Sequence, residues 1–279
     1  PKGKESIQTN PAWHEHQFKK VLQLCQAYET PVIVFADVSY LEVLKNWWNH
    51  FSAVATNKVI VVALNDGLES QIEGLPIACV TIAWSGSLEE LWLLRAQLFS
   101  QISAAGVDFI HSDIDAIWKR NPVPFCQSFE ADLVFSPGTV WPPDVVKEWG
   151  FVVCCGFFFV RATARASAFF QRVAHKLSEV SDDQVVVNRV LREDGMKWHF
   201  SSEPLEVCVQ NGYPYKIFYD AILGDSRSCS VALLPARLFP RKPDHADDPM
   251  VAHYLSKKSG DDKKLELKRN GLWGSHPRG

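Results

Sequence analysis

Short apolar runs alternate with stretches of helical periodicity over the first half of the chain. Runs of roughly four to eight apolar residues between turn signals indicate buried strands, and longer stretches with an apolar residue every three or four positions indicate helices. The predicted strands cover residues 31–36, 58–64, 78–83, 107–112 and 131–135. The predicted helices cover residues 14–27, 39–51 and 88–105. This alternation favours an α/β fold, with a mixed but mostly parallel sheet flanked by helices on both faces.

The second half of the chain has a less regular pattern. Residues 151–160 form a continuous apolar run, and residues 162–177 and 183–192 have helical periodicity. Short strands and loops then lead to a lysine-rich tail that ends in Leu272-Trp273. We expect a flexible segment at 1–12 and a single domain at 13–279. Its nucleotide-binding half would span about 30–125, and its acceptor half about 126–279.

Composition excludes several classes of protein. With 47% hydrophobic and 22% charged residues and a net charge of −3, the chain can build a core and lacks the charge of a disordered protein. It also lacks the basic excess typical of nucleic-acid binding. The longest apolar runs are strand-sized and do not approach the ~20 residues of a membrane span.

Cysteines and sequons bear on the cellular compartment. The 7 cysteines include no Cys-x-x-Cys pair, so we predict no structural zinc site. Scattered thiols without an Asn-x-Ser/Thr sequon favour a cytoplasmic location. The alternative is a catalytic domain trimmed from a Golgi enzyme, because the chain begins at Pro1 rather than Met and a signal or anchor would then precede it.

Two carboxylates directly follow the strand predicted at 107–112. Asp113 and Asp115 are two residues apart, so an extended segment places both side chains on one side. The carboxyl ends of parallel strands are where such sheets bind ligands. Two carboxylates there can hold Mn²⁺ or Mg²⁺, which would bridge the diphosphate of a nucleotide sugar. The same triplet also occurs in solvated turns, so the residues alone leave both interpretations open.

The segment around this pair resembles a known signature. Residues 106–122 are similar to the glycine, apolar strand, Asp-Val-Asp and Trp-x-x-x-Pro of glycosyltransferase family 77, a family of nucleotide-diphospho-sugar transferases. Matching segments elsewhere in the chain occur in the family's order: Asn46-Trp47, Cys155–Arg161, Ser181–Asn188, and His253 followed by lysines and Gly271-Leu-Trp273. The resemblance implies a GT-A fold and metal-dependent transfer from a UDP-sugar with retention of configuration. The chain departs from the family at Cys154-Cys155, where an Asn is usual, so the preferred sugar stays open.

The resemblance also implies roles for individual residues. His253 would be the third metal ligand beside Asp113 and Asp115, and the alternative is a hydrogen-bonded structural histidine. A retaining enzyme needs a polar group beside the anomeric carbon, as nucleophile or as stabiliser of positive charge. Asp183 is the predicted catalytic residue, with Gln184 next. Ser181 or Asp182 would cap the helix that begins there.

Donor contacts are predicted at strand ends and at basic residues. The strand ends should hold the base and ribose, and Arg95 should contact a phosphate or the ribose unless it is a surface residue. One or two lysines after His253 should neutralise the diphosphate from a flexible loop that orders over the donor. The predicted donor-binding residues are Phe35, Ala36, Asp37, Asn65, Asp66, Arg95, Ser112, Asp113, Asp115, Lys258 and Lys263.

Two further groups of residues have alternative interpretations. Trp141 and Trp149 are expected in a loop, either packed there or stacked on an acceptor. Cys154 and Cys155 are expected to be buried or pocket-lining thiols without a nearby base.

The sequence thus predicts a retaining glycosyltransferase that moves galactose, xylose or arabinose from a UDP-sugar to a hydroxyl of a glycan or glycoprotein. One alternative is an inverting transferase or a nucleotidyltransferase on a similar fold. The other is an inactive relative that only binds carbohydrate or protein. Intact Asp113, Asp115 and His253 disfavour the inactive relative, because such relatives usually lose metal ligands.

Overall fold

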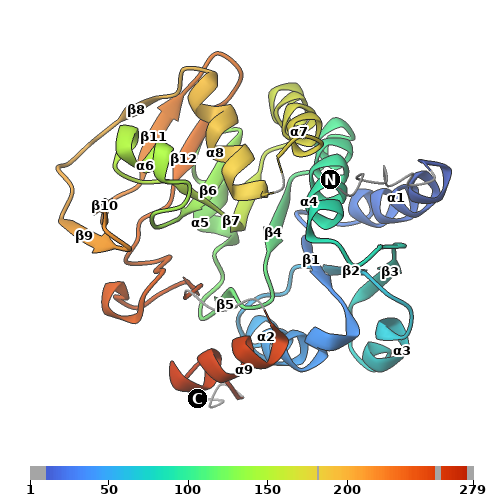
Figure 1. The fold of residues 1–279 in the computed structure, drawn as a ribbon. Coiled ribbons are helices and arrows are strands. Elements are labelled where there is room, and N and C mark those ends of the chain that lie inside the picture. The colour runs from blue at the N-terminus through green and yellow to red at the C-terminus, as the bar shows by residue number, and fades with distance from the viewer. Residues whose placement is uncertain (1–10, 181, 255–258, 275–279) are drawn as a thin grey trace, which may run out of the picture.

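A nine-stranded sheet runs through the molecule in a computed structural model, which describes residues 11–180, 182–254 and 259–274 (Figure 1). The strand order is β3-β2-β1-β4-β7-β6-β12-β11-β8. The strands are β1 Val32–Ala36, β2 Val59–Ala63, β3 Ala78–Thr81, β4 Phe109–Ser112, β6 Leu133–Pro137, β7 Val153–Val160, β8 Lys197–His199, β11 Ile222–Asp225 and β12 Ser230–Leu233.

The strands predicted from apolar runs are confirmed, with their ends moved by one or two residues. β3, β2, β1 and β4 are parallel, as the alternation with helices predicts. β7 is antiparallel to both β4 and β6, and β6 is parallel to β12. The sheet is therefore mixed, and the four adjacent parallel strands β3, β2, β1 and β4 come from the first half of the chain.

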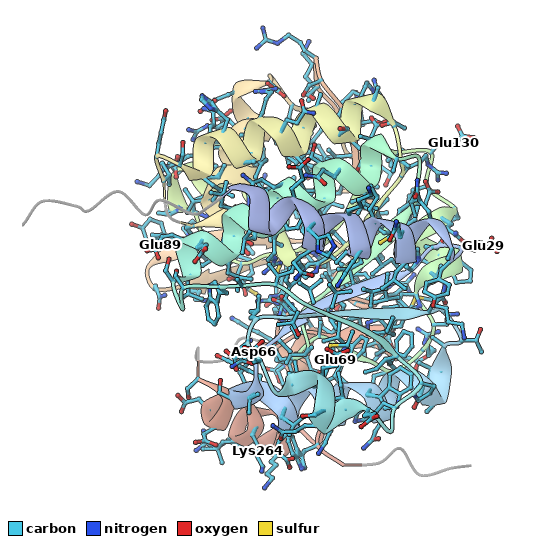
Figure 2. The ribbon with its side chains drawn as sticks, turned by 90° about the vertical axis from the view of Figure 1, so that its right-hand side faces the viewer. Glu29, Asp66, Glu69, Glu89, Glu130 and Lys264 are labelled. Carbon is cyan, nitrogen blue, oxygen red and sulfur yellow. The ribbon has the colours of Figure 1, made fainter. Side chains whose placement is uncertain are left out.

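Helices cover both faces of the sheet and enclose two hydrophobic cores. Alternate residues of β1 point to opposite faces, so Ile33 enters one core and Val32 and Val34 the other. The first face carries α1 Pro11–Gln26, α4 Leu88–Ala104, α7 Ala164–Leu177 and α8 Asp183–Glu193 (Figure 1). The second carries α2 Leu41–Val54, α3 Leu68–Ile72, α5 Val123–Gln127 and α9 Gly260–Arg269. Figure 2 shows α1, α4 and α7 stacked on one side and α3 and α9 on the other.

Two small sheets complete the architecture. β5 Ile117–Trp118 pairs antiparallel with β13 Val251–Ala252. β9 Glu206–Gln210 pairs antiparallel with β10 Tyr213–Ile217. Short 3-10 helices, η1 Val38–Tyr40 and η2 Pro243–His245, lie in the connections after β1 and before β13. The β5–β13 pair matters most for function, because it joins the segment after Asp115 to the segment before His253.

The loop expected around Trp141 and Trp149 is partly wrong, because residues 143–149 form helix α6 Pro143–Trp149. Pro143 begins this helix and Gly150 ends it in a left-handed conformation, which are ordinary start and stop signals. Trp149 is buried against Phe151, whereas Trp141 is 52% exposed. Of these two tryptophans, only Trp141 is therefore accessible from solvent.

Within the described part of the chain, none of the helices combines the length and the apolar character needed to cross a membrane.

Candidate active site

The three predicted metal ligands meet at the carboxyl end of β4. Asp113 follows this strand, and its backbone N–H donates to the Gly156 carbonyl oxygen at 2.7 Å. The β5–β13 ladder pairs Ile117 with Ala252 and so brings His253 beside Asp115. The His253 Nε2 lies 3.5 Å from Asp115 Oδ1. One ligand atom from each of Asp113, Asp115 and His253 lies within 4.8 Å of the others, a spacing that fits one divalent cation.

Gly156 leaves the space that this cluster needs. A Cβ at this position would overlap the His253 imidazole and lie 2.7 Å from Asp113 Oδ2. The glycine of the Cys155–Arg161 motif is therefore required by contact with two candidate ligands. Its backbone φ is not in the left-handed region, so conformational freedom is not the reason.

We expect Gly156→Ala to weaken Mn²⁺ binding by about 10-fold or more while leaving the fold intact, because displaced ligands no longer converge. A Mn²⁺ titration monitored by electron paramagnetic resonance measures this affinity. Gly74→Ala is the matched control, because a Cβ at this position meets open space. Gly195 also has open space, but its φ of +73° would strain an alanine. Unchanged Mn²⁺ affinity in Gly156→Ala would argue against a metal at this cluster.

Arg95 is buried at the centre of the site, so the surface alternative for this residue is wrong. Its Nη1 lies 3.6 Å from Asp113 Oδ1 and 3.7 Å from Asp183 Oδ2. Its Nη2 donates to the Cys155 carbonyl oxygen at 3.1 Å. The guanidinium also lies over the Phe35 ring, 5.7 Å from the centroid. The Arg95 guanidinium thus links Asp113, a candidate metal ligand, to Asp183, the candidate catalytic carboxylate.

His111 supports Asp113 from within the sheet. It is fully buried, and its Nδ1 lies 3.0 Å from the Ile33 carbonyl oxygen. Burial and the Arg95 charge lower the pKa of His111 to about 4, so the ring is neutral at physiological pH. Burial alone would raise the pKa of Asp113, but the His111 ring, 3.3 Å away, and Arg95 hold it below its usual range. Asp113 is therefore an ionised carboxylate.

Asp115 is held between Lys263 and His253. The Lys263 ammonium donates to Asp115 Oδ2 at 2.5 Å. Burial opposes ionisation, yet these two neighbours hold the pKa of Asp115 well below its usual range. Burial and Arg241 would lower the pKa of His253, but the Asp115 carboxylate outweighs them and raises it. Asp115 is therefore an ionised carboxylate that interacts with two basic side chains, Lys263 and His253.

Lys263 comes from a helix, so the flexible loop expected here is wrong for residues 260–269. Ser259 caps α9 by accepting from the Asp262 N–H, and acidic residues begin and basic residues end the helix. Lys264, from the same cluster, points to Glu42 and Trp273 instead. Lys258 lies outside the described residues, so its predicted phosphate contact remains a prediction.

Asp183 is the first residue of α8, where Asp182 caps the helix by accepting from the Val185 N–H. The side chain of Asp183 is 18% exposed. Burial raises its pKa to about 6, helped by the charges of Asp113 and Asp182 and opposed by Arg95. A carboxyl group in a cleft whose pKa is raised toward neutral pH is typical of catalytic sites.

The other motif residues of α8 hold it in place. Asn188 is fully buried, accepts from the Val153 N–H at 2.9 Å and donates to the Val153 carbonyl oxygen at 2.9 Å. The Gln184 amide donates to the Trp141 carbonyl oxygen at 2.6 Å. Asn188 thus fixes α8 to β7, which positions Asp183 and Gln184 at the cleft.

The motif residues near the N-terminus and the C-terminus also have structural roles. The Asn46 amide donates to the Leu272 carbonyl oxygen at 3.0 Å, and its Oδ1 accepts from the Gly274 N–H at 2.9 Å. Trp47 donates to the Ala116 carbonyl oxygen at 3.1 Å and so holds the loop that contains Asp115. The resulting contact between α2 and α9 is visible in Figure 1.

A cleft with a volume of about 210 Å³ contains these groups. Its lining is mostly polar and charged, and includes Arg95, Asp113, Asp115, Asp183, Gln184, His253 and Lys263 from the predicted set. The structure thus brings both catalytic candidates and all three metal ligands into one cleft.

Apart from Lys258, which the structure does not describe, the remaining predicted donor residues are not among those that line this cleft. Some have other partners: Asp37 caps η1, Asn65 accepts from the Val38 N–H at 3.1 Å, and the Ser112 hydroxyl donates to the Asp113 carbonyl oxygen at 3.1 Å. Ala36 is the last residue of β1 and is buried in the core. Asp66 is exposed at the start of α3 (Figure 2). Their contacts with a donor remain predictions.

Two cleft residues were missed or misjudged. Arg241 lines the cleft, and its buried Nε and Nη1 have no hydrogen-bond partner among the described residues. Nothing in the local sequence distinguishes this arginine from others. The expectation that Cys154 has no nearby base is wrong, because its Sγ lies 3.9 Å from His253 Nδ1. Burial would raise the pKa of this thiol, but Arg241 and His253 lower it to about 7.

The fold and site define a class of nucleotide-sugar enzymes with a carboxylate pair at the end of a central strand. The family model for nucleotide-diphospho-sugar transferases matches residues 76–267 of the 279. The chain therefore belongs to this family of glycosyltransferases.

Curated relatives match part of the chain. Arabinosyltransferase XEG113 of Arabidopsis thaliana is 21% identical over 173 residues, which cover 55% of this chain and 26% of that protein. UDP-galactose:fucoside alpha-3-galactosyltransferase of Dictyostelium discoideum is 27% identical over 95 residues, which cover 33% of this chain and 14% of that protein. The chain thus spans less than a third of the length of these relatives.

Solved structures show the same fold. The galactosyltransferase LgtC, in complex with donor and acceptor sugar analogues, superposes with a TM-score of 0.53. The superposition covers 89% of this chain and 98% of that chain at 10% identity. This likeness confirms the GT-A fold.

Proposed function

We propose that the chain transfers a sugar from a UDP-sugar to a hydroxyl of a glycan or glycoprotein acceptor, with metal dependence and retention of configuration. The observation that carries the proposal is the convergence of Asp113, Asp115 and His253 in the cleft that also holds Asp183. The ligands Asp113 and Asp115 come from the proposed nucleotide-binding half, and Asp183 and His253 from the proposed acceptor half.

The chemistry of the ligand set fits Mn²⁺ or Mg²⁺. Two carboxylates and an imidazole suit Mn²⁺ in particular, and Gly156 keeps the space between them clear. A divalent cation held there supplies charge that stabilises the departing nucleotide diphosphate. Lys263, already directed at Asp115, and the unpaired Arg241 guanidinium add positive charge for the phosphates.

Retention rests on Asp183. We assign its carboxylate to the anomeric carbon, as nucleophile or as stabiliser of oxocarbenium character, and Gln184 to positioning beside it. Arg95 orients this carboxylate and Asp113 together through one guanidinium. An inverting enzyme would instead use this carboxylate as a base on the acceptor, and the anomeric configuration of the product, measured by NMR, separates the two.

The donor sugar is proposed from the relatives. Their names include an arabinosyltransferase and a galactosyltransferase, which supports arabinose and galactose ahead of xylose. Cys154 stands in the cleft where the family usually has Asn, so we expect this thiol to influence the choice. Hydrolysis of a panel of UDP-sugars tests the choice directly.

UDP is expected to stabilise the chain only when Mn²⁺ is present, because the cation joins the diphosphate to the carboxylate pair. At a ligand concentration of about 100 times Kd, the stabilisation is roughly 2.7 kcal/mol, which is a shift of several degrees in Tm. Thermal unfolding with UDP, with Mn²⁺, with both and with neither measures it. The absence of any metal-dependent shift would favour an inactive relative that binds carbohydrate or protein without a nucleotide.

A further inference from the structure

A second group of metal-ligating side chains lies away from the candidate active site. Glu206 and Cys208 are on β9, and His245 is in η2. One ligand atom from each lies within 4.8 Å of the others. None of the three lines the cleft that contains Asp115. The group is therefore distinct from the proposed Mn²⁺ site.

The distances within this group match those around a zinc ion. Cys208 Sγ lies 3.7 Å from His245 Nε2 and 3.2 Å from Glu206 Oε1. With a Zn–S distance of about 2.3 Å and Zn–N and Zn–O distances of about 2.1 Å, tetrahedral ligand atoms are roughly 3.4–3.6 Å apart. For the two separations that involve Cys208, shifts of a few tenths of an ångström therefore suffice.

The orientation of β9 provides independent support. Its outward face is apolar, with Val207 58% and Val209 67% exposed, whereas Glu206 and Cys208 lie on the opposite face. Cys208 pairs with the buried Tyr215 and packs against the core. A half-buried strand ordinarily turns its apolar residues inward, and a shift of one residue would do so here. The observed register instead faces the thiol and the carboxylate toward His245.

One buried polar atom on the same face of β9 lacks a partner. The Gln210 Oε1 has no hydrogen bond within the described chain. The Tyr215 hydroxyl, by contrast, interacts with Lys242 and with the Cys208 thiol. Unsatisfied buried groups such as the Gln210 oxygen are uncommon and usually mark a missing water or ion.

We propose that Glu206, Cys208 and His245 bind a zinc ion. A thiolate, an imidazole and a carboxylate are the ligands of a borderline-soft cation, and they suit zinc better than Mn²⁺ or Mg²⁺. Binding replaces the thiol proton of Cys208, which leaves to solvent, and the two negative ligands balance the charge of the ion. The Lys242 ammonium acts electrostatically on both Cys208 and His245, so its positive charge opposes the charge of the ion.

Zinc here would join two distant segments. Cys208 and His245 are 37 residues apart, and His245 lies between Arg241 and His253, which both line the active-site cleft. The ion would brace this segment against the β9–β10 hairpin. The absence of Cys-x-x-Cys spacing argues only against zinc sites built from two neighbouring cysteines. The group formed by Glu206, Cys208 and His245 is a different kind of site.

Cobalt titration of the metal-free protein tests the proposal. We expect Co²⁺ to produce a thiolate charge-transfer band with the d–d absorption of a tetrahedral site, and Zn²⁺ to displace it. The band should disappear in Cys208→Ser and His245→Ala. It should persist in Cys154→Ser, the matched control, because Cys154 is the other cysteine in contact with a histidine ring among the described residues.

A missing band in the wild-type protein, its survival in Cys208→Ser, or its loss in Cys154→Ser would each overturn the assignment. Circular dichroism of each variant checks folding. If Cys208→Ser does not fold, Glu206→Gln decides, with at least a 10-fold loss of Co²⁺ affinity expected and an unchanged affinity contradicting the site. UDP-sugar hydrolysis is not part of this readout, so the outcome does not depend on the proposed function.

Discussion

Asp115→Asn is expected to abolish metal-dependent hydrolysis of the UDP-sugar. The substitution keeps the shape of the side chain but removes the charge that faces His253 and Lys263. A bound cation contributes several kcal/mol to stabilising charge in the transition state, so kcat/KM should fall on the order of 1,000-fold. Steady-state release of UDP in the presence of Mn²⁺ measures the change.

The control for this variant removes a carboxylate far from the cleft. Asp225→Asn is suitable, because its side chain is 68% exposed and contacts His199 only at 3.5 Å. It should hydrolyse the donor at the wild-type rate. Full activity in Asp115→Asn would remove the metal site, and with it the central support for the proposed mechanism.

Asp183→Asn is expected to reduce turnover and to stabilise the fold at neutral pH. The pKa of Asp183 is raised from 3.8 to about 6, so its contribution to stability is complete below pH 3.8 and is lost as pH rises through 6. At pH 7 the buried charge therefore costs about 1–3 kcal/mol, which the neutral amide avoids. Thermal unfolding and hydrolysis of the same preparation measure both effects.

The pH profile gives a second measure of the same residue. If the ionised carboxylate acts on the sugar, the kcat of the wild-type protein should fall as pH drops below about 6. Asp182→Asn is the matched control, because asparagine also caps helices and should keep the rate at neutral pH. Its acid limb should move to lower pH, because the Asp182 charge that helps to raise the pKa of Asp183 is gone. A wild-type rate in Asp183→Asn would transfer the catalytic assignment to Gln184.

The predictable part of the fold consists of elements whose signal lies within their own stretch of sequence. β1 and β2 are apolar runs buried on both faces, so their composition alone identifies them. The antiparallel insertion of β7 has no local signal, because a strand buried on both faces is the same apolar run in either direction. The cap of α9 did have a signal, Ser259 with Asp262, which the cluster of lysines obscured.

The site divides along the same line. The position of Asp113 and Asp115 at the cleft was predictable, because ligands bind at strand ends in α/β sheets. His253 and Arg241 reach the cleft through tertiary structure, and only the family resemblance indicated the first of them. Asn46 and Asn188 are motif residues whose role is to fix helices, so an ordered motif marks the architecture of a site as well as its chemistry.

The two-residue ladder between β5 and β13 has a consequence for synthesis of the protein. A ribosome-bound chain that has emerged as far as β7 contains β1 to β4, Asp113 and Asp115, yet it has neither the imidazole nor the ammonium that share Asp115. Until residues 251–263 follow, Asp115 lacks both of these partners, whereas Asp113 can already contact Arg95 and His111. Metal affinity should therefore arise late, after the sheet has formed, and a prematurely terminated chain would fold much of its core without gaining the means to cleave nucleotide sugars.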